Sequence, residues 1–282
     1  MKAAEPYLIV DVFTDTPLEG NQLGVFTDAR NLSPEQMQRL ARELNFSETV
    51  FVLGSEHGGD ARARIFTPTR ELPFAGHPAL GTAVVIGTAR GLERVRLETG
   101  LGTIPVQLSH ENEAVTYGRM EQVIPSWRSY DRPAELLAAL GIDASVLPID
   151  AYPNGPLHVY VGLESEDAVA QLRPDIRALG ELDEVAANCF AGSGRHWKTR
   201  MFAPGLAAGE DPATGSAAGP LAVHLARHGQ IAFGEEIEIR QGAEIGCPSV
   251  LYARAEGSAE RVERVEVAGA AVIVARGEFL LT

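Results

Sequence analysis

The segment IFTPTRELPFAGHPALGTAVV, residues 65–85, has a second copy in MFAPGLAAGEDPATGSAAGPLAV, residues 201–223. Each copy begins with Phe-x-Pro, at Phe66 and at Phe202, and the second contains three extra residues. Six further positions then match in order: Glu71/Glu210, Pro73/Pro212, Gly76/Gly215, Ala79/Ala218, Ala83/Ala222 and Val84/Val223. Internal similarity of this kind predicts two halves built on one design.

Each copy predicts a strand that runs through a Pro- and Gly-containing turn into a buried helix. The apolar run that follows the first turn predicts a helix from about Pro78 to Gly91, and the second predicts one over residues 215–229. Residues 7–13, 49–53, 158–163 and 195–202 are short apolar runs typical of strands, as is most of the tail from residue 236.

A third helix is predicted over residues 33–44. Ser33 is a good N-cap, Pro34 suits the first turn, and Gln36 stands three residues after the cap. Short strands outnumber helices along the whole chain, and they do not alternate regularly with them. The fold class expected is therefore α+β, with two pseudo-symmetric halves that each wrap a sheet around a central helix.

The stretch 123–133, VIPSWRSYDRP, is rich in turn residues and has no clear period. We expect it to link an N-terminal half over residues 1–125, completed by the last strand at about 268–282, to a C-terminal half over 126–267. If the two halves face each other, the two helix N-termini converge on one cleft, which would be the active site.

Composition excludes several classes of partner. The 282 residues carry a formal net charge of −14, which argues against nucleic acid and against an anionic membrane surface. Cys189 and Cys247 lie far apart without a CxxC spacing, as in proteins of reducing compartments. The chain shows neither a signal peptide nor an apolar stretch long enough to cross a bilayer, so we expect a cytoplasmic protein.

The two turns could bind an anion. A helix N-terminus offers unpaired N–H groups and a partial positive charge, and Gly76 and Gly215 would let a ligand approach the backbone. The turn at 209–219 is not a phosphate loop, since Gly215 is followed by Ser216 where such a loop needs Lys. Ordinary helix capping remains the simpler explanation for either turn taken alone.

Three side chains are candidates for chemistry. Asp211 could exchange a proton or bind a polar substrate, although Asp before Pro is commonly a turn residue. His77 could act in acid–base chemistry or simply occupy a helix start. Glu48, between a helix and an apolar strand, is from its position alone more easily read as a solvated carboxylate.

No cofactor or metal site is predicted. His224 and His228 lie one helical turn apart, but HLARH lacks the Glu of the zinc-protease motif and no third ligand is evident, which favours a polar helix edge. The glycine-rich segments lack the spacing and the acidic residue of a dinucleotide site.

Several motifs together resemble the PhzF family, whose fold is that of diaminopimelate epimerase. They are DVFTDTPLEGNQLGVF, NFSETVF, FTPTRELPFAGHPALGTA and EDPATGSAAGPLA, supported by RLETGLGTIPV, NCFAGSGRHWKTRMFAP and LARHGQIAFGEEIEIRQGAEIG. The resemblance runs over essentially the whole chain.

The resemblance implies a homodimeric, cofactor-independent isomerase of phenazine biosynthesis. Its reaction would convert trans-2,3-dihydro-3-hydroxyanthranilate, a small anionic substrate, to a reactive aminoketone. The family's general acid/base glutamate falls on Glu48, and its histidine and aspartate on His77 and Asp211. The resemblance places substrate-binding groups at Ser47, Gly76, Gly215 and Ser216. Burial beside apolar neighbours would raise the pKa of the Glu48 carboxyl towards the working pH.

One departure from the wider epimerase superfamily narrows the chemistry. Amino-acid epimerases of this fold have Cys before the Gly in each half, whereas this chain has Ala75 and Thr214. Two-sided racemisation by thiols is therefore not expected. Two alternatives remain: an isomerase of the same layout for another small amino or hydroxy acid, and a non-catalytic protein that binds a carboxylate.

Overall fold

The computed structural model describes residues 3–111, 114–182, 185–206 and 209–281. The chain divides into two compact units, one of residues 1–121 with 268–282 and one of residues 122–267. Strands dominate both units, with few helices, as the sequence predicts. No helix among the described ranges is long and apolar enough to span a membrane.

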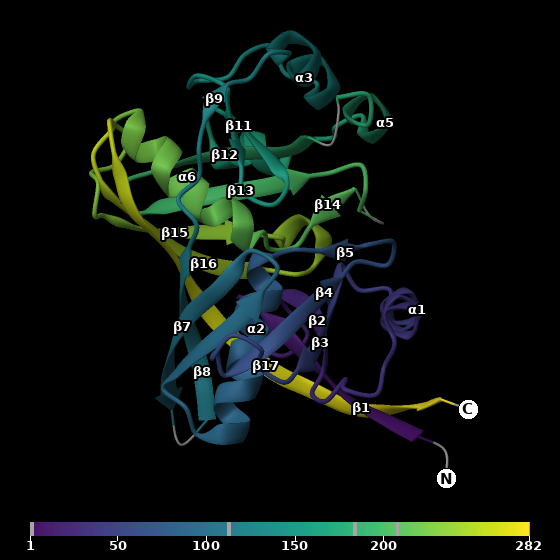
Figure 1. Ribbon diagram of the computed structural model, residues 1–282. Coiled ribbons are helices and arrows are strands. Elements are labelled where there is room, and N and C mark those ends of the chain that lie inside the picture. The colour runs from purple at the N-terminus through teal and green to yellow at the C-terminus, as the bar shows by residue number, and fades with distance from the viewer. Residues whose placement is uncertain (1–2, 112–113, 183–184, 207–208, 282) are drawn as a thin grey trace. The chain divides into compact units, whose positions relative to one another are not determined.

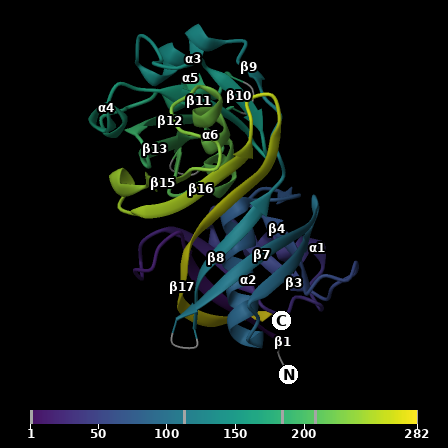
Figure 2. The same cartoon turned by 90° about the vertical axis from the view of Figure 1, so that its left-hand side faces the viewer.

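The described residues of the first unit form two helices and most of nine strands. They are β1 (Ala3–Val12), β2 (Asn21–Phe26), α1 (Pro34–Leu44), β3 (Glu48–Leu53), β4 (Ala61–Phe66), β5 (Glu71–Leu72), α2 (Gly76–Arg90), β6 (Arg94–Thr99), β7 (Gly102–Glu111), β8 (Ala114–Gln122) and the end of β17 (Val262–Leu281). Strand β17 pairs with both β1 and β8, so the order β1-β2-β3-β4-β6-β7-β8-β17 returns to its start. Figure 2 shows β8 beside β17.

Helix α2 forms the core of this unit (Figure 1). Its residues from Gly76 to Gly87 are all buried, and it packs against β1, β2, β3, β4, β6 and β7. A helix that is apolar on every face must be enclosed, which explains why strands surround it. The helix begins two residues before the predicted Pro78, and Gly91 ends it in the left-handed conformation with φ 64°.

Helix α1 confirms the predicted capping chemistry. The Ser33 hydroxyl accepts a hydrogen bond from the Gln36 backbone N–H, and the Gln36 side chain accepts one from the Ser33 N–H. Asn45 ends the helix in the left-handed conformation, with φ 55°. Strand β3 begins three residues later, at Glu48.

The second unit follows the same order of strand, turn and helix. Its elements are β9 (Arg128–Ser129), α3 (Pro133–Leu140), β10 (Asp150–Pro153), β11 (Leu157–Gly162), α4 (Glu166–Ala170), α5 (Ile176–Leu179), β12 (Val185–Ser193), β13 (His196–Phe202), β14 (Glu210–Asp211), α6 (Gly215–Arg227), β15 (Glu236–Gln241), the 3₁₀ turn η1 (Ala243–Ile245), β16 (Ser249–Gly257) and the beginning of β17. Helix α6 is buried from Gly215 to Ala226 and packs against β11, β15 and β16.

Strand pairing in the two units follows one scheme. In the first unit β2 is parallel to β3, β3 antiparallel to β4, β4 parallel to β6, and β6 antiparallel to β7. In the second, β11 is parallel to β12, β12 antiparallel to β13, β13 parallel to β15, and β15 antiparallel to β16. The matched pairs Phe66↔Glu71 and Phe202↔Glu210 hold the turns before α2 and α6.

A buried carboxylate organises one loop of the first unit. Glu98 is 3% exposed and accepts hydrogen bonds from the Ser55 hydroxyl and from the backbone N–H groups of Glu56, His57 and Gly59, at 2.7–2.8 Å. These hydrogen bonds, above all the one from the Glu56 N–H, lower the pKa of Glu98 to about 2, because they stabilise the charged form.

Replacement of Glu98 by Gln is expected to destabilise the protein at neutral pH, since an amide replaces the charge that four donors surround. The pKa of this group is lower in the folded chain than in the unfolded chain, so its contribution is complete above pH 4.5 and is lost towards pH 2. Thermal unfolding of the wild type and Glu98→Gln should give a difference in Tm that shrinks across that interval. A difference that is constant with pH would contradict this role.

Candidate active site

Glu48 lies at the first position of β3, and its side chain is 15% exposed. The strand is parallel to β2, with Leu23 opposite Glu48, so that the backbone on either side is held by ladder hydrogen bonds. The sequence position alone favoured a solvated carboxylate, but the structure places this side chain in largely buried surroundings. A carboxylate so placed is suited to chemistry on a bound molecule.

His77 is the second residue of α2 and is 4% exposed. The N-cap residue, Ala75, makes no side-chain hydrogen bond to the first turn. Burial lowers the pKa of His77 to about 3, and a hydrogen bond to the Gln22 backbone opposes this shift only in part. The imidazole is therefore neutral at physiological pH.

The Glu48 and His77 side chains lie together in the first unit. Glu48 Oε2 is 3.7 Å from His77 Nε2, and this nitrogen makes no hydrogen bond with the described residues. The bond to Gln22 raises the pKa of His77, as donation to a carbonyl does, and therefore involves a proton on Nδ1. In the neutral ring Nε2 is then an acceptor, as is a carboxylate oxygen, which accounts for their separation beyond hydrogen-bond distance.

Ser47 joins this group through a residue that the sequence analysis did not single out. Its hydroxyl donates to Asn21 Oδ1 at 3.2 Å, and Asn21 is fully buried at the first position of β2. A buried polar residue at the start of a strand often belongs to a site. In the sequence, the only signal for Asn21 is its place inside the motif GNQLG.

Asp211 lies in β14 of the second unit and is 7% exposed. Its Oδ2 accepts a hydrogen bond from the Thr214 hydroxyl at 2.6 Å. Gln241 donates to the Asp211 carbonyl and to Thr214 Oγ1, each at 2.9 Å, and its own Oε1 accepts from the Thr214 N–H at 3.2 Å. The turn between β14 and α6 is thus fixed by side chains.

The first turn of α6 contains Gly215 and Ser216, and its carbonyls accept hydrogen bonds from side chains outside the helix. Pro220 has no N–H, so the Ser216 carbonyl lacks its usual partner four residues on. Asn154 Nδ2 donates to that carbonyl at 2.8 Å instead, and Gln122 Nε2 donates to the Gly215 carbonyl at 2.9 Å. The backbone at Gly215 and Ser216 is held in place as a result.

The structure therefore brings the candidate residues together in two sets. Glu48, His77, Ser47 and Gly76 lie in the first unit, and Asp211, Gly215 and Ser216 in the second. In each set a side chain from a strand stands near the first turn of the unit's buried helix.

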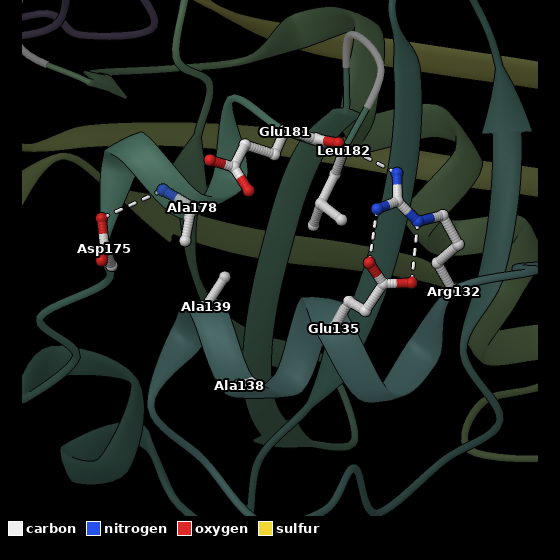
Figure 3. A pocket seen from close by; sticks show the side chains of 8 residues that line it. All are labelled: Arg132, Glu135, Ala138, Ala139, Asp175, Ala178, Glu181 and Leu182. Atoms are coloured by element: carbon white, nitrogen blue, oxygen red, sulfur yellow. Dashed lines mark hydrogen bonds and ion pairs between the residues drawn. The ribbon is translucent and has the colours of Figure 1, made fainter.

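A pocket in the second unit lies between α3 and α5 and contains none of the candidate residues (Figure 3). Two of its charged groups pair with each other: Arg132 Nε donates to Glu135 Oε1 at 2.8 Å, and Arg132 Nη1 also donates to the Glu181 carbonyl at 2.9 Å. Asp175 caps α5 through the N–H groups of Arg177 and Ala178. We assign no chemistry to this pocket.

Asp150, His224 and His228 offer three ligand atoms within 4.8 Å of one another, so a third group does accompany the two histidines. However, Arg227 Nη1 lies 3.1 Å from Asp150 Oδ2, and His228 Nε2 lies 2.9 Å from the same oxygen. A guanidinium already neutralises the carboxylate that a cation would need. We interpret the cluster as an ion-pair network that ties the end of α6 to β10.

The expectation of a polar helix edge is wrong for His224, which is fully buried. Its ring stacks on Tyr160 with centroids 5.4 Å apart, and it meets Tyr152 and Phe190 edge to face. Burial lowers the pKa of His224 to about 3, so that the ring packs as a neutral aromatic group.

Comparison with known proteins identifies the family. Residues 10–277 match the PhzC-PhzF family, described as phenazine biosynthesis-like proteins. The chain belongs to this family. It is 55% identical over 275 residues to the trans-2,3-dihydro-3-hydroxyanthranilate isomerase of Pseudomonas aeruginosa, a match that covers 98% of this chain and 99% of the relative. The protein of the same name from Pseudomonas fluorescens is 56% identical over the same length and coverage.

Solved structures agree with this assignment. A PhzF-family phenazine biosynthesis protein of Bacillus anthracis superposes with a TM-score of 0.85 at 28% identity, covering 99% of this chain and 100% of the other. A hydroxyproline epimerase of Agrobacterium vitis, at 14% identity, superposes with a TM-score of 0.68 over 99% and 91% of the two chains. The fold is thus shared with epimerases, as the sequence motifs predicted.

Proposed function

We propose that this protein is a trans-2,3-dihydro-3-hydroxyanthranilate isomerase of phenazine biosynthesis. The observation that carries this proposal is the near-complete match, at 55–56% identity, to relatives that bear this name. The placement of Glu48 beside a neutral His77 supports it, because the reaction needs a carboxylate able to take and return a proton.

The two units are, in this proposal, pseudo-symmetric halves of a duplicated design, each a sheet around a central helix. The matched strand pairing supports the duplication, with halves at about 1–125 plus 268–282 and at 126–267. The active site would occupy the cleft between them, so that the two sets of residues act on one substrate. Closure of the halves on the ligand would exclude water from the proton transfer.

Glu48 is the proposed general base and acid. As a carboxylate it removes the proton from C3 of the ring, and as the resulting acid it delivers a proton to C1. One carboxyl group can serve both carbons when they present hydrogen on the same face. This transfer gives an enol at C3, which becomes the ketone when the hydroxyl loses its proton to solvent and C4 takes one. The atoms balance without an added reactant, because each proton lost is matched by one gained. The proposed reaction uses no cofactor for this reason.

The remaining residues hold the substrate. His77 Nε2, an acceptor in the neutral ring, suits an amino or hydroxyl hydrogen of the substrate, and Asp211 suits the other such group. The substrate carboxylate would take the N–H groups of the first helical turns near Gly76 and Gly215, with the Ser216 hydroxyl. Ser47 would line the site beside Glu48.

We further propose a homodimer in the cytoplasm. Two-thiol racemisation is not proposed, because Ala75 offers no thiol and the Thr214 hydroxyl is engaged with Asp211 and Gln241.

The test is turnover by the purified chain. We expect the absorbance of dihydrohydroxyanthranilate to fall at an enzymatic rate. With trans-4-hydroxyproline at the same concentration, we expect no change in optical rotation, which would report epimerisation. Turnover of hydroxyproline alone would support an isomerase for a different small acid. Binding of dihydrohydroxyanthranilate without turnover would leave a carboxylate-binding protein, and either result would refute the proposed reaction.

A further inference from the structure

Two buried polar residues, His158 and Asn188, stand behind Ser216 in the first turn of α6 and have no role in the proposed reaction. His158 in β11 is fully buried, Asn188 in β12 is 3% exposed, and Ser216 is 7% exposed. His158 Nε2 lies 3.0 Å from Ser216 Oγ, and Asn188 Nδ2 lies 3.2 Å from His158 Nδ1. The three side chains form one chain of hydrogen bonds whose proton positions can be derived.

The orientation of the Asn188 amide is set by a carbonyl. Asn188 Nδ2 is 2.8 Å from the Ala186 carbonyl oxygen, which can only accept, so the amide nitrogen must face it. The second hydrogen of the same nitrogen is then directed to His158 Nδ1. Nδ1 therefore accepts a hydrogen bond and carries no proton.

The proton of the neutral His158 ring must consequently reside on Nε2. Burial lowers the pKa of His158 to about 3, so that the ring keeps a single proton at any pH near neutrality. Nε2–H donates to Ser216 Oγ, which occupies the serine oxygen as an acceptor. The hydrogen of the hydroxyl cannot point to His158 and has no acceptor among the described residues.

We propose that Asn188 and His158 are positioning residues that hold Ser216 as a hydrogen-bond donor to the substrate carboxylate. This inference rests on the proposed function, in which Ser216 contacts the substrate. With its backbone N–H at the start of α6, Ser216 would present two donors to one oxygen. The site selects an anionic acceptor there and disfavours a cationic or donor-only group.

The direction of the hydrogen bond between His158 and Ser216 also distinguishes Ser216 from a catalytic nucleophile. In a hydrolase triad the histidine accepts the serine proton, whereas here the histidine donates to the serine oxygen. Ser216 therefore has no base behind it and serves to bind.

Proton positions can be measured without substrate. In protein labelled with ¹⁵N-histidine, long-range ¹H–¹⁵N correlation spectra distinguish the two neutral tautomers, and His158→Gln identifies the signal among the seven histidines. We expect His158 to be protonated at Nε2 only, without titration between pH 5 and 8. A proton at Nδ1, or titration within this interval, would overturn the proposal whatever the enzyme's activity.

A double-mutant cycle then tests the functional link. Ser216→Ala and His158→Phe should each lower kcat/KM about ten- to a hundredfold, the range for a hydrogen bond to a charged group. The double variant should be within about threefold of Ser216→Ala, because both changes remove one interaction. If the losses in kcat/KM of the two single variants multiply in the double variant, His158 has a merely structural role, which would contradict the proposal.

Two further variants guard against general damage. His158→Gln retains a donor and should recover part of the activity that His158→Phe loses. His224→Gln removes another buried neutral histidine of the same unit and should leave kcat/KM unchanged. If the wild type does not turn over dihydrohydroxyanthranilate, the proposed function fails. The same double-mutant cycle is then measured on the Kd of anthranilate. If the effects of the two substitutions on this Kd multiply, the inference about Ser216 is overturned independently of the proposed function.

Discussion

Replacement of Glu48 by Gln is expected to lower kcat by a factor of about 10² to 10⁴, the usual contribution of a positioned general base. The amide is isosteric with the carboxyl group but cannot accept a proton from carbon. His77 cannot substitute for it, because burial keeps its pKa at about 3 and leaves a weak base. The measurement is the steady-state rate of substrate loss.

The control separates chemistry from folding. Glu43→Gln changes an exposed carboxylate five residues earlier and should keep full activity. The Kd of anthranilate, which shares the substrate's carboxylate and amine, should change less than about threefold in Glu48→Gln, because a uniform binding group would alter KM instead. Full turnover by a folded Glu48→Gln variant would exclude Glu48 as the acid/base group.

Replacement of Glu210 by Gln is expected to reduce the free energy of unfolding by about 3–5 kcal/mol. Glu210 pairs with Arg200 through two hydrogen bonds of 2.7 and 2.8 Å, and each side chain is 6% exposed. The Arg200 guanidinium also donates to the carbonyls of Ala170, the last residue of α4, and of Leu172. Removal of the carboxylate would leave a buried charge without its counter-ion.

The repeat supplies a matched control for this change. Glu71 and Arg64 hold the corresponding positions in the first unit, with the same two-point geometry at 2.7 Å, but their side chains are 42% and 18% exposed. Solvent screens this pair, so Glu71→Gln should cost no more than about 1 kcal/mol. Urea unfolding of both variants measures the difference, and equal losses would show that burial does not decide the strength of the pair.

Much of the framework could be predicted from local patterns. Ser33 and Gln36 form the capping box that their spacing indicates, and the apolar runs after Gly76 and Gly215 form buried helices. Local rules suffice at these places because the partners lie within four residues of each other. The proximity of Glu48 and His77 was expected only through the family resemblance, since 29 positions separate them.

The features that could not be predicted depend on contacts distant in sequence. His158 and Ser216 are 58 residues apart, and Asp150 reaches His228 across 78 residues. A single sequence carries no periodic signal for such pairs. His224 was misassigned because its spacing to His228 suggested a shared polar face, whereas aromatic rings from β10, β11 and β12 enclose it. The two-residue strands β5 and β14 are likewise too short for a period of two to be recognised.

The most direct test follows the proton itself. Wild-type protein and Glu48→Gln are incubated with dihydrohydroxyanthranilate in D₂O, and the product is examined by NMR. If Glu48 transfers the proton, the wild type removes the hydrogen at C3 and forms a product with one new hydrogen isotope at C1. The enol formed in this step also takes a solvent deuterium at C4 as it becomes the ketone, while the variant leaves the substrate unchanged. A product without a new hydrogen isotope at C1, or equal turnover by the two proteins, would contradict proton transfer by the single carboxyl group of Glu48.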